Sequence, residues 1–225
     1  HPSETVAVNI LGLQHVLDAL AGQPVERLTF ASTADVYTPD VAVHDEEASK
    51  TPTNVYGASK LAGEWLLRYA RQAGLRAAVR VPRFFNVIGP GETNPHVLPA
   101  VIEQLRTSDV LQLGNLEPKR DYIFVGDIAA AVVALLEHDS DDDLTVNVGT
   151  GRSCSVREVV EVAADLLGRP LRIEVDPARV RATDRPNLQA SVQRLDALLP
   201  DRPRTSLRDG LRALLRSEGF ALRAG

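Results

Sequence analysis

The chain has 225 residues, of which 44% are hydrophobic and 24% charged, values typical of a soluble globular protein with one large domain or two small ones. Its net charge of −5 gives no electrostatic reason to expect nucleic acid or an anionic membrane as a partner. No apolar run approaches the roughly 20 residues that a membrane helix needs, and the opening residues do not form a signal peptide pattern. The single cysteine, Cys154, excludes an internal disulfide and indicates a buried thiol in a reducing cytoplasm.

The first third of the sequence alternates between helical and strand patterns. Apolar residues at helical spacing predict a helix over 5–21, which Gly22 and Pro24 end. A β-rich run predicts a strand over 27–32, and the polar, proline-containing stretch 38–54 is typical of a loop. A helix of about 18 residues follows over 55–72, and then a strand that ends at Pro82. This alternation predicts an α/β fold in which a parallel sheet carries helices on both faces.

The remaining sequence predicts a second set of elements behind a Gly/Pro-rich loop at 86–95. Asp127 is the expected cap of one of the helices. Ser155 and Glu158 form a capping box that opens another helix, which ends before Gly168. No linker separates the two sets, which favours two interleaved lobes. The predicted helices cover 98–106, 128–138, 155–167 and 206–219, and the predicted strands cover 110–114, 144–149 and 171–175.

Tyr56 and Lys60 are the strongest chemical signal. Residues four apart on a helix share one face, which sets the phenol beside the ammonium. A nearby cation favours the phenolate and would lower the tyrosine pKa from its usual value near 10. The pair could therefore move a proton on and off a sugar hydroxyl. Taken alone, the same spacing also fits an ordinary solvated helix.

Ser32 and Thr33 stand at the end of a predicted strand. Ligands of open parallel sheets bind outside the carboxyl ends of the strands. A hydroxyl at this position could hydrogen-bond the same substrate oxygen that Tyr56 deprotonates. The alternative is that the two residues only terminate the strand.

Five motifs in series strengthen the chemical interpretation: A-S-T-A-D-V-Y, N-V-Y-G-A-S-K-L-A-G-E, R-F-F-N-V-I-G-P-G, K-R-D-Y-I-F-V-G-D-I and N-V-G-T-G-R-S-C-S-V. In this order and spacing the chain resembles the extended short-chain dehydrogenase/reductases, the NAD-dependent epimerase/dehydratase family that acts on nucleotide sugars. The resemblance implies a Rossmann-type sheet with a smaller substrate lobe, NAD or NADP as cofactor, a nucleotide-diphosphate sugar as substrate and a homodimer. It places a partial cofactor domain at 1–85 with about 121–150, and the nucleotide-sugar lobe at 86–120 and 151–225.

The resemblance also implies a role for each matching residue. The catalytic residues would be Thr33, Tyr56 and Lys60. The same three residues, with others near the nicotinamide, would contact the cofactor, and a further group would contact the sugar nucleotide. The cofactor group is Asn9, Ser32, Thr33, Tyr56, Lys60 and Phe85; the substrate group is Thr33, Asn86, His96, Val97, Leu111, Leu113, Arg120, Arg181 and Asp184. Arginine suits phosphate because its planar fork binds two oxygens, and His96 and Val97 open a helix whose free N–H groups attract anions.

Two departures from the family pattern affect these expectations. The G-x-x-G-x-x-G turn that cradles a pyrophosphate is absent, and no methionine occurs even at position 1, so we expect the chain to begin inside a longer protein and to be inactive on its own if it is a fragment. Sugar 4,6-dehydratases carry an acidic pair after the catalytic threonine, where this chain has Ala34 and Asp35. Ala34 cannot transfer a proton, which favours an epimerase. Asp35 and the R-x-x-D-R-P stretch keep a dehydratase or 4-reductase of the GDP-mannose type as the alternative.

No metal site is expected. The five histidines show no i, i+4 pairing with one another and no cysteine partners. The aspartates of 139–143 lack the spacing of a calcium loop and are most simply a solvated loop.

Overall fold

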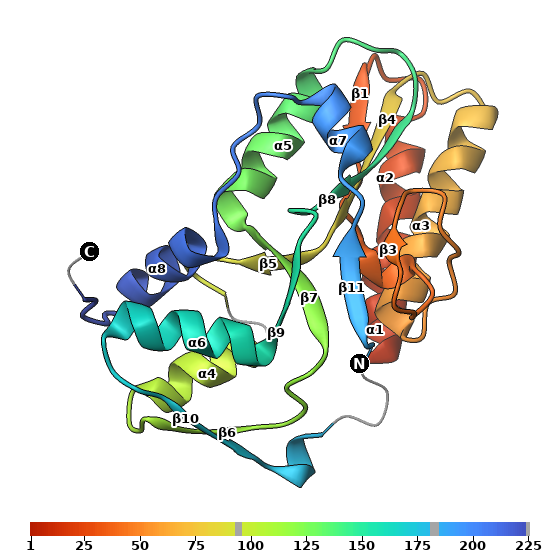
Figure 1. Cartoon of the computed structure of the whole chain (residues 1–225). Helices are drawn as coiled ribbons and strands as arrows, with labels where there is room; N and C mark the ends of the chain where they lie inside the picture. Colours follow the sequence, from red (N-terminus) through yellow and green to blue (C-terminus); the bar gives the residue numbers. More distant parts are fainter. Residues whose placement is uncertain (93–95, 181–184, 224–225) are drawn as a thin grey trace.

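A computed structural model describes residues 1–92, 96–180 and 185–223 and confirms the predicted α/β class. Its first sheet is parallel and centred on β4 (Figure 1). Two short strands pair with successive parts of one edge of β4 and act as one interrupted strand, while β8 pairs with the other edge. The strands of this sheet are β1 (Arg27–Thr29), β2 (Ser32–Thr33), β4 (Ala78–Phe84) and β8 (Leu144–Val148).

Helices from the first part of the chain cover one side of this sheet (Figure 1). The expected helix 5–21 runs continuously from Pro2 to Leu20 but contains a π-helical turn, and the expected helix 55–72 has those bounds in the structure. The side chain of Asn54 caps the latter by accepting a hydrogen bond from the Gly57 N–H, 2.7 Å away. These elements are α1 (Pro2–Val6), η1 (Ala7–Leu11), α2 (Gly12–Leu20) and α3 (Val55–Gln72). Leu17 and Leu67 pack on Val79 and Val81 of β4 and form the core between the layers.

A second sheet is built around β7, which the sequence pattern did not reveal. β5 and β11 pair with β7 in parallel, β9 pairs with it antiparallel, and β3 extends the sheet beyond β11. The two-stranded parallel pair of β6 and β10 stands apart. The strands are β3 (Val43–His44), β5 (Asn86–Ile88), β7 (Lys119–Phe124), β9 (Ser153–Ser155), β11 (Asn187–Ala190), β6 (Val110–Leu113) and β10 (Arg172–Val175). Short strands therefore occur inside both stretches that were predicted as loops, 38–54 and 86–95.

The later helices enclose the largest core cluster, to which α4, α6 and α8 contribute. The predicted capping box of α6 is confirmed, since Ser155 and Glu158 exchange the two expected hydrogen bonds. These helices are α4 (Val97–Leu105), α5 (Val125–Glu137), α6 (Val156–Leu167), α7 (Gln193–Leu198) and α8 (Leu207–Ser217). Two 3-10 turns, η2 (Ala34–Val36) and η3 (Pro177–Arg179), complete the secondary structure of the described ranges.

The expected cap of α5 is wrong. The helix begins at Val125, two residues before Asp127, and shows no side-chain cap. The Asp127 carboxylate instead accepts hydrogen bonds from the N–H and the hydroxyl of Thr205, each 2.7 Å away. Asp127 therefore fixes the segment that leads into α8, because tertiary partners outside the helix compete for its side chain.

None of the helices in the described ranges is long and apolar enough to cross a membrane. Within the same ranges, no group of three or more histidine, cysteine, aspartate or glutamate side chains is arranged to hold a metal ion. The two-lobe division remains a prediction.

Candidate active site

Thr33 lies at the carboxyl edge of the first sheet, where β2 ends and the η2 turn begins. Its hydroxyl accepts a hydrogen bond from the Asp35 N–H, 3.2 Å away, and so caps the turn. Thr33 is 8% exposed and pairs with Phe84, the last residue of β4, whose other edge pairs with the last residue of β8. The sheet thus presents Thr33 at the edge where open parallel sheets bind their ligands.

Tyr56 and Lys60 lie in the first turns of α3, next to Thr33. The Lys60 Nζ is 5.8 Å from the centre of the Tyr56 ring and 5.0 Å from that of Phe30. Within the described residues, ring faces are the neighbours of this ammonium, and no carboxylate or carbonyl pairs with it. Tyr56 is 45% exposed, so its phenol remains accessible to a ligand.

The pKa of Tyr56 differs from the expectation. Burial of the ring raises this pKa above its usual value, and the nearby Asp35 carboxylate raises it further, while hydrogen bonding with Thr33 opposes both. Burial lowers the pKa of Lys60. The expected lowering of the tyrosine pKa by Lys60 is therefore not seen in the chain by itself, because burial dominates the shift and Lys60 is not among its causes.

Two glycines allow α3 to approach the strand ends closely. A Cβ at Gly57 would lie 2.4 Å from the Asp35 carbonyl oxygen, and a Cβ at Gly63 would lie 2.5 Å from the Phe30 ring. Any larger residue at either position would push the helix away from Thr33. The glycines in the second motif thus set the distance between the threonine and the tyrosine.

Asn9 reaches α3 from the π-helical turn of the opening helix. Its Nδ2 donates to the Ser59 hydroxyl at 2.9 Å, and that hydroxyl donates to the Tyr56 carbonyl at 2.8 Å. Single π-helical turns inside α-helices often occur at functional sites. Ser59, which the sequence reasoning missed, is therefore the link between Asn9 and the first turn of α3.

Ser32 takes a different position from Thr33. Its hydroxyl is buried and donates to Glu64 at 2.6 Å, and Glu64 forms a two-pronged ion pair with Arg83. Arg83 also donates to the Tyr37 hydroxyl, which donates to Asn147. The suggestion that the Ser32 hydroxyl binds a substrate oxygen is therefore wrong, because the strand turns this side chain into the interior.

Asp35 is held beside the site by partners from two other segments. Asn54 donates to its carboxylate at 3.2 Å, and the Arg185 guanidinium lies 3.9 Å from the other oxygen. Arg185 also donates to the carbonyls of Ala34 and Asp35. The sequence reasoning missed Arg185, although the R-x-x-D-R-P stretch that contains it was the available signal.

Phe85 and Asn86 follow the end of β4. Phe85 is buried, with its ring centre 6.3 Å from that of Tyr37. The Asn86 Oδ1 is buried without a hydrogen-bond partner. A buried, unpaired amide oxygen costs free energy, so this atom is a candidate acceptor for a ligand donor.

The other predicted substrate residues lie in several places. His96 is exposed at the N-terminus of α4 and makes no side-chain cap, and Val97 is the first residue of that helix.

Leu111 and Leu113 point into the core, so their side chains are not available to a nucleotide base. Only the main chain of β6 could make that contact. Arg120 donates to the carbonyls of Lys119 and Arg185. Arg181 and Asp184 lie outside the described residues.

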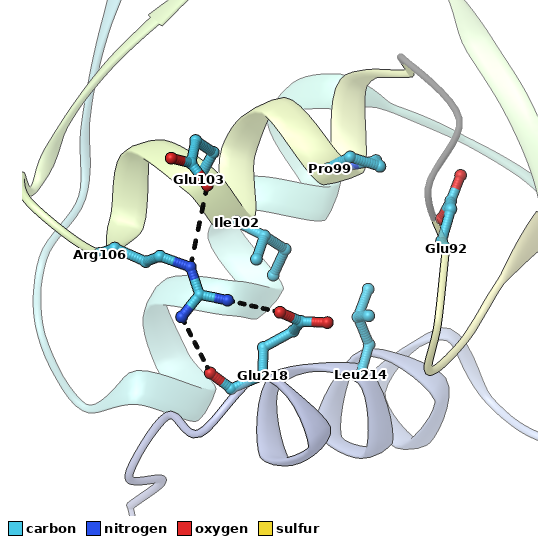
Figure 2. A pocket seen from close by; sticks show the side chains of 7 residues that line it. All are labelled: Glu92, Pro99, Ile102, Glu103, Arg106, Leu214 and Glu218. Carbon is cyan, nitrogen blue, oxygen red and sulfur yellow. Dashed lines mark hydrogen bonds and ion pairs between the residues drawn. The ribbon is translucent and has the colours of Figure 1, made fainter.

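A separate cavity of about 150 Å³ lies between α4 and α8. Figure 2 shows Arg106 joined to Glu103 and Glu218 across it, with Glu92 on the opposite side. Burial raises the pKa of Glu92 to about 7, and one of its carboxylate oxygens has no partner. Sites for nucleotide-sized ligands usually enclose at least about 300 Å³, so this cavity is too small to be the substrate site.

Comparison with known proteins agrees with this geometry. Residues 1–149 match the model of the NAD dependent epimerase/dehydratase family. The chain is 31% identical over 95% of its length to GDP-6-deoxy-D-mannose reductase of Pseudomonas aeruginosa and 35% identical over 77% to UDP-glucose 4-epimerase of Streptomyces lividans. It spans 73% of the first relative and 57% of the second.

A solved structure gives the same result at the level of the fold. The chain superimposes with a TM-score of 0.84 and 29% identity on MoeE5 in complex with UDP-glucuronic acid and NAD, covering 93% of this chain and 70% of that one. The extended short-chain dehydrogenase resemblance is thereby confirmed. The chain belongs to the NAD dependent epimerase/dehydratase family.

Proposed function

We propose that this chain carries the catalytic residues of an NAD(P)-dependent nucleotide-sugar epimerase. The observation that carries the proposal is the meeting of Thr33, Tyr56 and Lys60 at the carboxyl edge of the first sheet. When bound, an oxidised nicotinamide would supply a hydride acceptor for the sugar C4 position and a positive charge that favours the phenolate. Tyr56 would take the C4 hydroxyl proton and return it, and Thr33 would hold the same oxygen.

The described residues fit the nicotinamide end of such a cofactor. The N–H groups of Lys60 have no carboxylate or carbonyl partner in the described ranges and could bind ribose hydroxyls. Asn9 and Ser59 would fix the first turn of α3, and Phe85 would close one wall of the ring pocket. The Ser32 hydroxyl is bonded to Glu64, so Ser32 would contact the cofactor through its main-chain atoms. We propose NAD as the cofactor, with NADP as the alternative, because these 225 residues contain no glycine turn from which the residue that selects between them could be located.

A nucleotide-diphosphate sugar is the proposed substrate. Asn86, with its unpaired buried oxygen, would receive a donor from the substrate, and the N-terminus of α4 at His96 and Val97 would face the diphosphate. Arg120, Arg181 and Asp184 complete the proposed set, together with the main chain at Leu111 and Leu113. The UDP-glucuronic acid of the MoeE5 complex supports this class of substrate.

The reaction type depends on the residues after Thr33. Ala34 has no proton to give, and Asp35 is occupied by Asn54 and Arg185. Both features support epimerisation over dehydration. The similarity to GDP-6-deoxy-D-mannose reductase supports a 4-reductase as the second candidate. A catalytically inert relative remains the third.

Product analysis distinguishes these candidates. The protein would be incubated with NAD and, in turn, UDP-, dTDP-, CDP- and GDP-hexoses, with Tyr56→Phe as the control. An epimerase converts one substrate to its C4 epimer and accumulates no 4-keto-6-deoxy sugar. Accumulation of that keto sugar would make the protein a dehydratase with Asp35 as its base. NADPH-dependent reduction of a 4-keto sugar would make it a reductase.

We further propose an isologous homodimer in the cytoplasm, formed by the opening helix and α3. Trp65 and Tyr69 of α3 are 62% and 70% exposed, and Val8, Leu11 and Val16 of the opening helix are exposed as well. Such adjoining apolar side chains are typical of a self-complementary interface. Leu20, Leu61 and Leu66, on the same two helices, are already partly buried. Light scattering at micromolar concentration should show a dimer for the wild-type protein and a monomer for Trp65→Glu. A wild-type monomer would contradict the proposal.

A further inference from the structure

An open groove lies between α6, α8 and the segment that follows α8. It has a volume of about 650 Å³, and its lining consists of four arginines, one aspartate and two leucines: Asp165, Leu166, Arg208, Arg212, Arg216, Leu222 and Arg223. In Figure 1, α8 and the C-terminal end lie on the left of the molecule, whereas α3 with Tyr56 and Lys60 lies on the right. The groove is therefore separate from the candidate active site.

The sequence of α8 explains why the arginines gather here. Leu211, Leu214 and Leu215 are buried in the core, which fixes the rotation of the helix. Arg208, Arg212 and Arg216 recur every four residues and so form a row along the adjoining face. Ser206 caps the helix by accepting a hydrogen bond from the Asp209 N–H at 3.1 Å. The row is thus displayed on a helix that is fixed at its start and along its apolar face.

Arg223 is brought to the other side of the groove by the chain after α8. Its N–H donates to the Leu166 carbonyl at 2.8 Å, and its side-chain stem lies against Gly168 at the end of α6. An ion pair of 2.5 Å between Arg208 and Asp165 ties α8 to α6. Arginines from two separate segments therefore face one groove across a tertiary contact.

The charges in the groove are not balanced. Asp165 pairs with Arg208, and Asp209 pairs with Arg212. In the described part of the chain, no carboxylate pairs with Arg216 or Arg223, and both residues are exposed. Two guanidinium groups therefore remain for an anion in a chain whose net charge is −5.

We propose that this groove binds a compact oligophosphate, the chemistry shared by inorganic tripolyphosphate and the phosphate chain of a nucleoside triphosphate. The planar guanidinium fork suits phosphate oxygens, and several forks along one groove suit several linked phosphates. The volume matches that of sites for nucleotide-sized ligands. Nucleic acid is disfavoured because a long polyanion would also meet the acidic remainder of the surface.

Isothermal titration with tripolyphosphate at about 0.1 M salt tests the proposal. Wild-type protein should bind one tripolyphosphate per chain with a dissociation constant below about 1 mM. The double variant Arg216→Gln, Arg223→Gln should bind it at least about 10-fold more weakly. The matched control is Arg76→Gln, Arg152→Gln, which removes two exposed arginines elsewhere and should bind as wild type does. Equal weakening in both double variants would overturn the proposal, because it would show a general charge effect.

Further arms identify the site and the source of the ligand. Binding should persist with saturating UDP-glucose, and its loss would assign the anion to the proposed sugar-nucleotide site instead. Orthophosphate should bind at least about 10-fold more weakly than tripolyphosphate, and equal affinity would overturn the oligophosphate class. ATP binding equal to that of tripolyphosphate would show that the phosphate chain alone is recognised, and tighter binding would place the base against the two leucines. Tighter binding of a DNA duplex than of tripolyphosphate would overturn the proposal.

Discussion

Two neighbouring groups of polar side chains at the end of the first sheet differ in how many of their polar atoms have hydrogen-bond or ion-pair partners. The buried group of Ser32, Glu64 and Arg83 has partners for its hydroxyl, carboxylate and guanidinium. The accessible group, named after the half-exposed Tyr56, also includes Lys60 and Asn86 and is less completely paired in the described residues. Tyr56 hydrogen-bonds with Thr33, but the Lys60 ammonium faces aromatic rings and the Asn86 Oδ1 is buried without a partner. A fully paired buried group stabilises one conformation, whereas unpaired polar atoms at a strand end remain available to a ligand. How completely the polar atoms are hydrogen-bonded or ion-paired, more than the residue type, separates the structural group from the candidate catalytic one.

The largest effect should come from breaking the buried group. Glu64→Ala would leave the Arg83 guanidinium buried without its carboxylate, and should lower the free energy of unfolding by about 3–5 kcal/mol. Urea denaturation would measure this loss. Glu64→Gln, which keeps the shape and one hydrogen bond, should lose less. An alanine variant within about 0.5 kcal/mol of wild type would show that the ion pair contributes no net stability.

Removing a polar group from the accessible group should reduce the reaction rate and leave the free energy of unfolding nearly unchanged. Tyr56→Phe should reduce epimerase turnover at least about 10²-fold, equivalent to roughly 2.7 kcal/mol in the barrier. Its free energy of unfolding should stay within about 0.5 kcal/mol of wild type, because Tyr56 is half-exposed and water can replace its hydrogen bond with Thr33. Steady-state kinetics and urea denaturation on the same sample test both statements. Unchanged turnover would remove Tyr56 from the reaction.

Ser32 and Thr33 allow the contrast to be tested between adjacent residues. Ser32→Ala removes a buried donor to Glu64 and should cost about 1–2 kcal/mol of stability with turnover little changed. Thr33→Val should cost less stability, since it loses the cap of one short turn and a hydrogen bond with the half-exposed Tyr56, but should strongly reduce turnover. Thermal unfolding and initial rates measured on the two variants would reveal the opposite pattern if the assignment of the two hydroxyls is reversed.

The smallest effect concerns Glu92 in the cavity of Figure 2. Its folded pKa of about 7 lies above the usual 4.5, so the folded state binds the proton more tightly than the unfolded state. The stability from this group is present at low pH and is lost as the pH rises from about 4.5 through about 7. Glu92→Gln should therefore nearly match wild type at pH 4 and exceed it by about 1 kcal/mol at pH 8, a figure reduced for half-burial and solvent screening. A constant difference between the two pH values would show that Glu92 does not titrate in this range.

Local sequence determined most of the elements that position the site. The bounds of α3, the capping box of α6 and the parallel character of the first sheet were predictable, because helical periodicity, caps and strand–helix alternation act within a few residues. β7, β9 and β11 were not predictable in the same way. These strands pair with segments far away in the chain, and their polar residues do not show a buried-strand pattern.

The roles of individual side chains depended on the tertiary structure. The motifs identified Thr33, Tyr56 and Lys60 as a set, but only the fold turned Ser32 inward, seated Leu111 and Leu113 in the core and placed Arg185 beside Asp35. It also gave Asp127 a partner other than the helix that it was expected to cap. The physical reason is that a hydrogen bond, an ion pair or a pKa depends on which distant groups approach a side chain and exclude water, and the sequence states the residues without those neighbours.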